Sequence, residues 1–121
     1  MKNKSIDDLV FFAEHEAEFS ESATPKEKCV REQPMQRTWH HFTSEDGKFF
    51  AGIWEAEPGC WTVSYTENEF CQILSGRSIL RDESGRERSL KPGDNFTIPR
   101  GFSGQWEVLE TTRKIYVIYE P

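Results

Sequence analysis

Short runs of β-forming residues, separated by turn residues, follow one another from Arg37 to the end of this 121-residue chain. The runs are rich in Trp, Tyr, Phe, Ile, Val and Thr, and Gly and Pro gather in the breaks between them, as in strands joined by turns. No stretch after residue 37 shows helical periodicity of useful length. The fold class predicted is therefore all-β, a sandwich or a closed barrel. We expect strands at residues 38–42, 48–56, 60–66, 69–75, 77–82, 87–91, 94–98, 104–109 and 112–119.

The N-terminal part is polar and charged apart from one apolar run at residues 9–13. Ser5, with Asp8 three positions later, is typical of a capping box that opens a helix. The apolar run itself is β-branched and aromatic, which suits a strand equally well. We expect a strand or an extended arm over residues 6–13.

Residues 20–28 are polar and include a proline, so they predict a solvated connector. The expected organisation is an N-terminal arm and connector over residues 1–36, followed by a barrel over residues 37–121. The arm would pack either on its own barrel or on a neighbouring subunit, and the sequence leaves both open.

Charge and cysteine content limit the partners. The chain has a net charge of −6 and a pI near 5.1, and an acidic domain repels phosphate backbones, so we expect no nucleic acid partner. No apolar run approaches the roughly 20 residues needed to span a membrane, and the first residues lack the pattern of a signal peptide. Three cysteines without CxxC spacing suit reduced thiols, so we expect a cytoplasmic protein.

Two segments carry a family resemblance. In residues 59–76, a glutamate at Glu69 precedes a glycine at Gly76 by seven positions; in residues 93–104, a glycine is followed, after five residues, by Pro99-Arg-Gly101. These segments resemble the two motifs of the cupin superfamily, and the resemblance covers residues 37–119.

Several phrases resemble small single-domain cupins related to ureidoglycine aminohydrolase and to the ethanolamine-utilisation cupin, namely residues 52–59, 65–70 and 101–110. The resemblance implies an RmlC-like jelly-roll barrel (a double-stranded β-helix). It also implies a homodimer, because cupins of this size are commonly dimers.

The chain departs from the metal-binding cupins at their ligand positions. In those relatives motif one supplies two histidines and a glutamate, and motif two supplies a third histidine. With Glu69 matched to the glutamate, Val63 and Tyr65 stand at the first two histidines and Gly104 at the third. One carboxylate does not hold a transition metal, which needs three or four ligands, so we expect no metal cofactor.

Adjacent histidines do not rebuild the site. His40 and His41 follow each other on an expected strand, so their side chains point to opposite faces. One of them could still face the interior beside Glu69, which leaves a Mn²⁺ or Zn²⁺ site of unusual ligands as the minor alternative.

Alternation along the strands predicts the interior residues. If Glu69 faces inward, Cys71 and Ile73 face inward with it, and Val63, Val108 and the site residues of neighbouring strands share that interior. We expect an aromatic pocket whose ligand-binding residues are Trp54, Trp61, Tyr65, Glu69 and Trp106.

Each of these residues also has a purely structural explanation. Trp54, Trp61 and Trp106 are more typical of a plain core than of a ligand cage, and Glu69 fits an ion pair to Lys114 or Arg113 on the last expected strand. Glu69 is nevertheless the candidate catalytic residue, because an interior carboxylate is costly without a partner or a purpose.

Three functions follow. The first is a metal-independent cupin that binds a small polar or cationic metabolite, with Glu69 and Tyr65 as polar anchors. The second is an enzyme similar to ureidoglycine aminohydrolase, acting on a small amine, amide or sugar-like substrate with Glu69 as acid or base. The third is an accessory or structural cupin whose cavity is filled by side chains. The sequence does not decide whether the chain is an enzyme.

Overall fold

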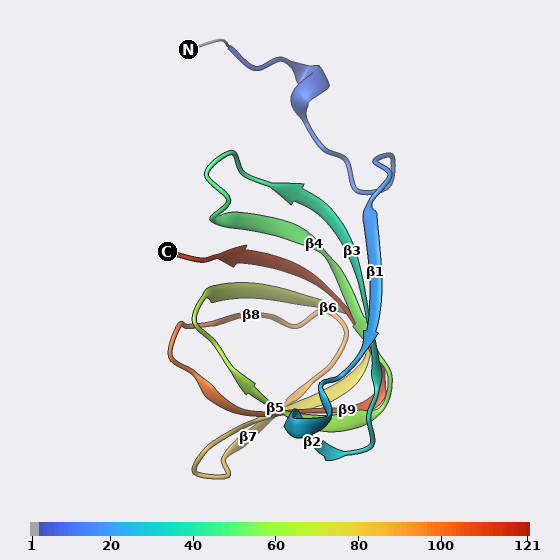
Figure 1. Ribbon diagram of the computed structural model, residues 1–121, viewed down its shortest axis with the longest axis vertical. Helices are drawn as coiled ribbons and strands as arrows, with labels where there is room; N and C mark the ends of the chain where they lie inside the picture. Colours follow the sequence, from blue (N-terminus) through green and yellow to red (C-terminus); the bar gives the residue numbers. More distant parts are fainter. Residues whose placement is uncertain (1–2) are drawn as a thin grey trace.

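The computed structural model describes residues 3–121, and it confirms the predicted all-β jelly-roll class. The strands form one strongly curled antiparallel sheet that wraps around an interior, with the N-terminal extension leaving one end (Figure 1). The two helices in the described residues are single 3-10 turns, η1 (Ile6–Asp8) and η2 (Lys26–Lys28). Neither is long or apolar enough to cross a membrane.

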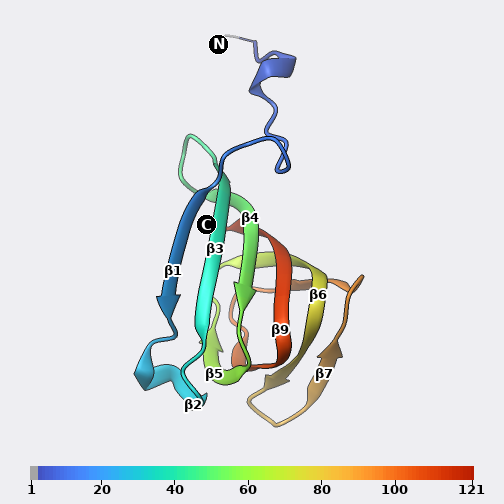
Figure 2. The same cartoon turned by 90° about the vertical axis from the view of Figure 1, so that its right-hand side faces the viewer.

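Within residues 3–121, nine strands make up the curled sheet. One face carries β1, β3, β4 and β9 side by side, as Figure 2 shows. β9 then pairs with β5 over one half of its length and with β6 along most of it, and β6 also pairs with β7 and β8. The bounds are β1 (Glu18–Ala23), β2 (Cys29–Arg31), β3 (Met35–Thr43), β4 (Phe49–Ala56), β5 (Gly59–Ser64), β6 (Asn68–Asp82), β7 (Glu87–Leu90), β8 (Asn95–Ile98) and β9 (Ser103–Tyr119).

Two long strands replace four expected ones. β6 spans the expected strands 69–75 and 77–82, and β9 spans 104–109 and 112–119. β6 carries bulges between Ile73 and Ser78, where Gly76 adopts a φ of +86°. A Cβ on Gly76 would lie 2.0 Å from the carbonyl oxygen of Thr111, so glycine lets β6 and β9 bend together without separating.

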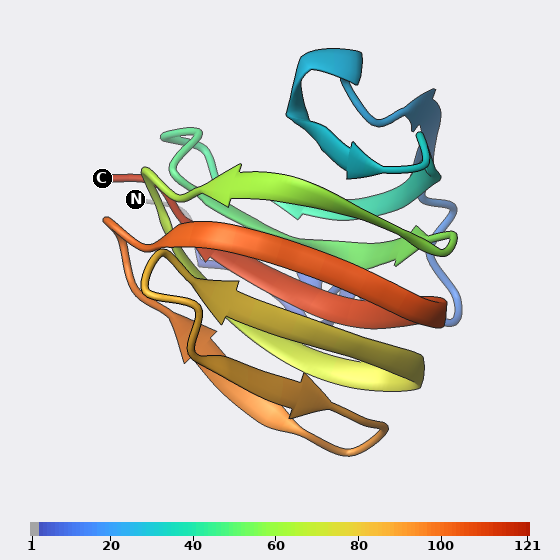
Figure 3. The same cartoon turned by 90° about the horizontal axis from the view of Figure 1, so that it is seen from below.

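The polar segment expected as a connector is partly a strand, and that prediction was wrong for residues 20–23. β1 pairs with β3 over its whole length although all six of its residues are exposed. β2 adds a second short strand beside β5, in the excursion visible at the top of Figure 3. Residues 24–28 between them hold η2, with Thr24 buried and bonded to the carbonyl oxygen of Pro34 at 2.8 Å.

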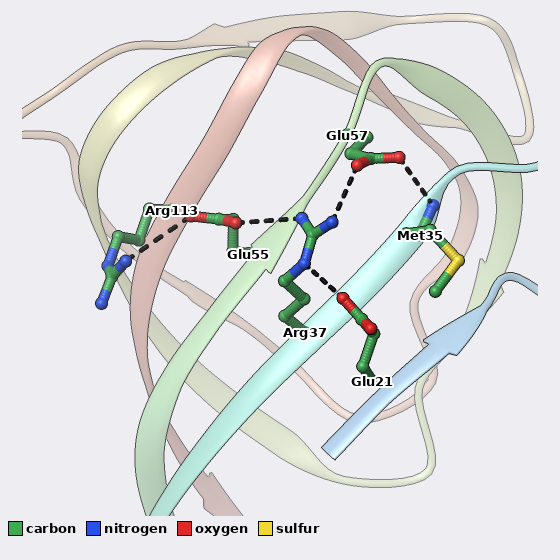
Figure 4. Close-up of polar contacts among 6 residues, drawn as sticks. All are labelled: Glu21, Met35, Arg37, Glu55, Glu57 and Arg113. Atoms are coloured by element: carbon green, nitrogen blue, oxygen red, sulfur yellow. Dashed lines mark hydrogen bonds and ion pairs between the residues drawn. The ribbon is translucent and has the colours of Figure 1, made fainter. Parts of the chain in front are cut away.

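An ion-pair network helps to hold this polar strand in place. The guanidinium of Arg37 on β3 binds Glu21 of β1 at 2.6 Å, Glu55 of β4 at 3.1 Å and Glu57 at 2.9 Å (Figure 4). Arg113 on β9 reaches the other oxygen of Glu55 at 3.5 Å. The charge-assisted bond from Arg37 to Glu21 thus adds to the backbone pairing of β1 with β3 and to the contact of Phe19 with Trp39.

The expectation of a strand over residues 6–13 was wrong. Ser5 and Asp8 form the capping box of η1, with the Ser5 amide donating to Oδ2 of Asp8 at 2.7 Å. The residues after η1 have no regular structure, but the ring of Phe12 stacks on His41 of the same barrel with centroids 4.2 Å apart. In this chain the arm therefore contacts its own barrel.

The core lies between the two halves of the curled sheet. It is built around Trp106, Val108, Ile73 and Cys71, which are almost fully buried. The indole nitrogen of Trp106 donates to Oγ of Ser78 at 3.1 Å, which satisfies the one polar atom of the largest buried side chain. Trp61 and Trp106 belong to this core and also line a cavity inside the barrel.

Candidate functional site

A cavity of about 380 Å³ opens inside the barrel. The structure places all five of the expected ligand-binding residues on its wall, from β4, β5, β6, β9 and the turn after β5. Most of its surface is aromatic, and a few polar groups interrupt it. Its lining residues are Gln36, Thr38, His40, Phe50, Trp54, Trp61, Val63, Tyr65, Glu69, Trp106, Lys114, Tyr116 and Ile118.

A buried ion pair lies in the wall of this cavity. Nζ of Lys114 on β9 is 2.8 Å from Oε2 of Glu69 on β6, and both side chains are at most 7% exposed. Of the two partners that the sequence offered for Glu69, Lys114 is the one that binds it, whereas Arg113 points to the outer face and binds Glu55. The pair removes the cost of burying an isolated carboxylate.

The ammonium of Lys114 also lies over two indole rings. It is 4.7 Å from the ring centroid of Trp54 and 4.4 Å from that of Trp106, within cation–π range. Burial is the largest single influence and lowers the pKa of Lys114, but the charge and hydrogen bond of Glu69 together with Cys71 and Tyr65 outweigh it, so this pKa lies above its ordinary value. Lys114 is therefore a fixed positive charge inside the barrel at neutral pH.

Two further titratable groups are held neutral here. Burial raises the pKa of Tyr65 above its ordinary value, and it raises the pKa of the Cys71 thiol to about 12. Sγ of Cys71 lies 3.3 Å from Oε2 of Glu69 and 3.6 Å from Nζ of Lys114. Cys71 is thus a protonated thiol that packs against the ion pair, not a nucleophile.

At the other side of the cavity His40 and Tyr116 form a hydrogen-bonded pair. Nδ1 of His40 is 2.7 Å from the Tyr116 hydroxyl, and Nε2 of His40 is 2.6 Å from Oγ1 of Thr43. Burial raises the pKa of Tyr116 to about 12. Gly52 on β4 makes room for this phenol, because a Cβ there would lie 2.5 Å from the Tyr116 hydroxyl.

The adjacent histidines face opposite sides of the sheet, as expected. His40 lines the cavity, whereas His41 contacts Phe12 and lies with Nδ1 3.1 Å from Nδ1 of His15. Gly104 does not line the cavity. It borders a polar groove at the foot of the barrel, and a Cβ on it would lie 1.8 Å from the carbonyl oxygen of Arg81.

The residues of the cavity do not fit a metal ion. Glu69, which matches the motif glutamate, already binds the ammonium of Lys114, and Val63 on the same wall has no donor atom. His40 uses both ring nitrogens on Tyr116 and Thr43. Across residues 3–121, no group of three or more His, Cys, Asp and Glu side chains is placed to hold a metal.

A family model described as the EutQ-like cupin domain matches residues 43–116, more than half of the chain. The chain belongs to this cupin family. The matched segment contains the cavity residues of β4, β5 and β6 and most of those on β9. None of the curated proteins matches this cupin.

Solved structures agree on the fold. The EutQ protein of Clostridium difficile is 25% identical, with a TM-score of 0.65 over 72% of this cupin and 64% of that chain. A DUF861-family protein of unknown function from Pseudomonas syringae is 20% identical, with a TM-score of 0.75 over 84% of this cupin and 44% of that chain. A DUF861-family protein from Thermotoga maritima is 39% identical, with a TM-score of 0.52 over 53% of this cupin and 73% of that chain. This cupin spans less than two-thirds of the first two of these structures.

Sequence reasoning did not place several cavity residues, namely Gln36, Thr38, Phe50, Tyr116 and Ile118. A signal for those on β9 was present. Trp106 and Val108 were assigned to the interior, and the same alternation carried along one continuous strand reaches Lys114, Tyr116 and Ile118. Because two separate strands were expected, with a break at residues 110–111, the alternation was not extended across that break.

Proposed function

We propose that this cupin binds a small polar molecule inside its barrel without a metal ion. The observation that carries the proposal is the cavity of about 380 Å³, which has aromatic walls and a few convergent polar groups. Small-molecule sites are commonly about 300–1,000 Å³ in volume and are lined in this way. A cavity of this size also argues against an accessory role with a filled interior.

The tryptophans form the walls of the proposed site and two polar side chains anchor the ligand. Tyr65 lines the cavity, and its phenol hydroxyl can donate a hydrogen bond there. Both contacts of the Glu69 carboxylate fall on Oε2, so Oε1 remains as an acceptor. One donor and one acceptor are thus available to orient a ligand.

Replacing Trp54 with alanine is expected to weaken ligand binding roughly tenfold or more, because a lost stacking contact costs about 1 kcal/mol beyond the buried area. Ligands would be found with a fragment collection by ligand-observed NMR, and their affinities for wild type and variant compared. Trp39→Ala is the matched control, since Trp39 lies against Arg113 on the outer face. Equal affinities for Trp54→Ala and wild type would place the site elsewhere.

Protein purified without a histidine tag is expected to contain metal far below one ion per chain, as measured by plasma mass spectrometry. Treatment with EDTA should leave the affinity for any fragment unchanged, because the polar anchors are a phenol and a carboxylate paired with lysine. Stoichiometric manganese, zinc, nickel or iron would contradict the metal-independent proposal. The homodimer and the cytoplasmic location remain predictions from the sequence.

A further inference from the structure

The surroundings of Lys114 have the composition of a binding site for an organic ammonium ion. A carboxylate oxygen of Glu69 lies 2.8 Å from Nζ, and the rings of Trp54 and Trp106 lie 4.7 and 4.4 Å from it. Ammonium ligands are commonly held by this combination of one anion and aromatic faces. We call these three residues the ammonium cage.

The occupant of the cage is part of the chain. Lys114 comes from β9 and enters between Glu69 of β6 and Trp54 of β4. Its side chain is 6% exposed, so the cage is closed around it. A cationic ligand would have to displace this ammonium or lie next to it against charge repulsion.

The remaining cavity carries no net fixed charge. Glu69 and Lys114 cancel, and apart from His40 the other lining side chains are uncharged aromatic, aliphatic, hydroxyl and amide groups. An anionic ligand near Lys114 would face Glu69 2.8 Å away, so it gains little from the lysine. A donor is available at Tyr65 and an acceptor at Oε1 of Glu69.

We infer that Lys114 is the internal occupant of the ammonium cage formed by Glu69, Trp54 and Trp106, and that it restricts the ligand of the cavity to polar molecules without net charge. The second half of this inference rests on the proposed function, whereas the first half does not. It also narrows the ligand class, since a cationic metabolite was among the expectations from sequence.

The first experiment empties the cage. Lys114→Ala removes three carbons and the ammonium, which together have the structure of n-propylammonium. The variant is expected to melt below wild type and to recover at least half of the lost Tm with millimolar n-propylammonium chloride. Sodium chloride at equal ionic strength should not restore it.

Two matched variants separate the cage from general stabilisation. Lys114→Met keeps the volume of the side chain and leaves no space, so n-propylammonium should not raise its Tm. Glu69→Gln combined with Lys114→Ala removes the anion, and the rescue should fall at least tenfold in apparent affinity. If Lys114→Ala does not fold alone, the same comparison is made as refolding yield with and without n-propylammonium. Absence of rescue by either measure, or equal rescue of Lys114→Met, would overturn the cage.

The second experiment tests the ligand class with three probes of matched shape, benzamide, benzoate and benzylammonium. Each carries the ring that the tryptophan walls would stack on, and they differ in charge. Wild type is expected to bind benzamide at least fivefold more tightly than either charged probe, by ligand-observed NMR at pH 7. Tightest binding of benzylammonium or benzoate would overturn the restriction to uncharged ligands.

The two experiments can overturn the ammonium cage and the proposed function independently of each other. If none of the probes binds while n-propylammonium rescues Lys114→Ala, the ammonium cage stands and both the proposed function and the ligand class fall. If benzamide binds preferentially and loses affinity in Trp54→Ala but rescue is absent, the proposed function stands without the cage.

Discussion

Replacing Lys114 with methionine is expected to lower the free energy of unfolding by about 3–5 kcal/mol, because it leaves the buried carboxylate of Glu69 without its partner. The pair is 2.8 Å apart and nearly excluded from solvent. The raised pKa of Lys114 keeps the contribution of the lysine present at pH 7, and this contribution is lost as the pH rises above the ordinary lysine value of 10.5 and through the raised pKa. Urea unfolding followed by circular dichroism measures the loss.

A double replacement isolates the pair. Glu69→Leu together with Lys114→Met removes both charges, so the double variant is expected to be close to wild type in stability, or above it. Arg113→Met is the control at the next position, because Arg113 is 38% exposed and lies 3.5 Å from Glu55. It should cost about 1 kcal/mol or less. A loss below about 1 kcal/mol for Lys114→Met would mean that Glu69 and Lys114 are not paired inside the barrel.

Replacing Trp106 with alanine is expected to cost about 3–5 kcal/mol, because it opens a large void in the core. Trp106 is 1% exposed and its indole nitrogen bonds Ser78. Trp106→Phe should cost less, since it keeps most of the ring and loses mainly that hydrogen bond. Phe19→Ala, on the outer face and 52% exposed, is expected to cost less than about 1 kcal/mol. Equal losses at Trp106 and Phe19 would contradict the core described here.

The interior of the barrel could be predicted where strands alternate without interruption. Glu69, Cys71 and Ile73 on β6 and Trp61 on β5 lie inside, as the two-residue period requires. Beyond Gly76 the next buried residue is Ser78, an even-numbered position, whereas the buried residues before it are odd-numbered. The bulges around Gly76 shift the register, and a local pattern does not reveal how many residues a bulge absorbs.

Strands made of polar residues were harder to predict from the sequence than the apolar ones. β1 was missed because its residues are exposed and offer no hydrophobic alternation. It is held by backbone pairing with β3 and by the ion pair of Glu21 with Arg37, 16 residues further along the chain. Pairing of that kind is a tertiary effect, so propensity alone does not show it.

Some features of the candidate site could likewise be predicted from the sequence, and others could not. The aromatic walls followed from strand phase, and Lys114 was named as one of two possible partners of Glu69. The choice between Lys114 and Arg113 depended on which of two neighbouring residues faces inward, which the continuous β9 decides. The contact between His40 and Tyr116 joins residues 76 positions apart, and no spacing in the sequence indicates it.

The uneven distribution of the tryptophans gives this cupin an optical reporter of its own. Three of its four tryptophans line the cavity, and only Trp39 lies outside it. In a Trp39→Phe background all indole fluorescence would therefore come from the wall of the cavity, so quenching or a shift in emission wavelength would follow occupancy of the barrel without any attached dye.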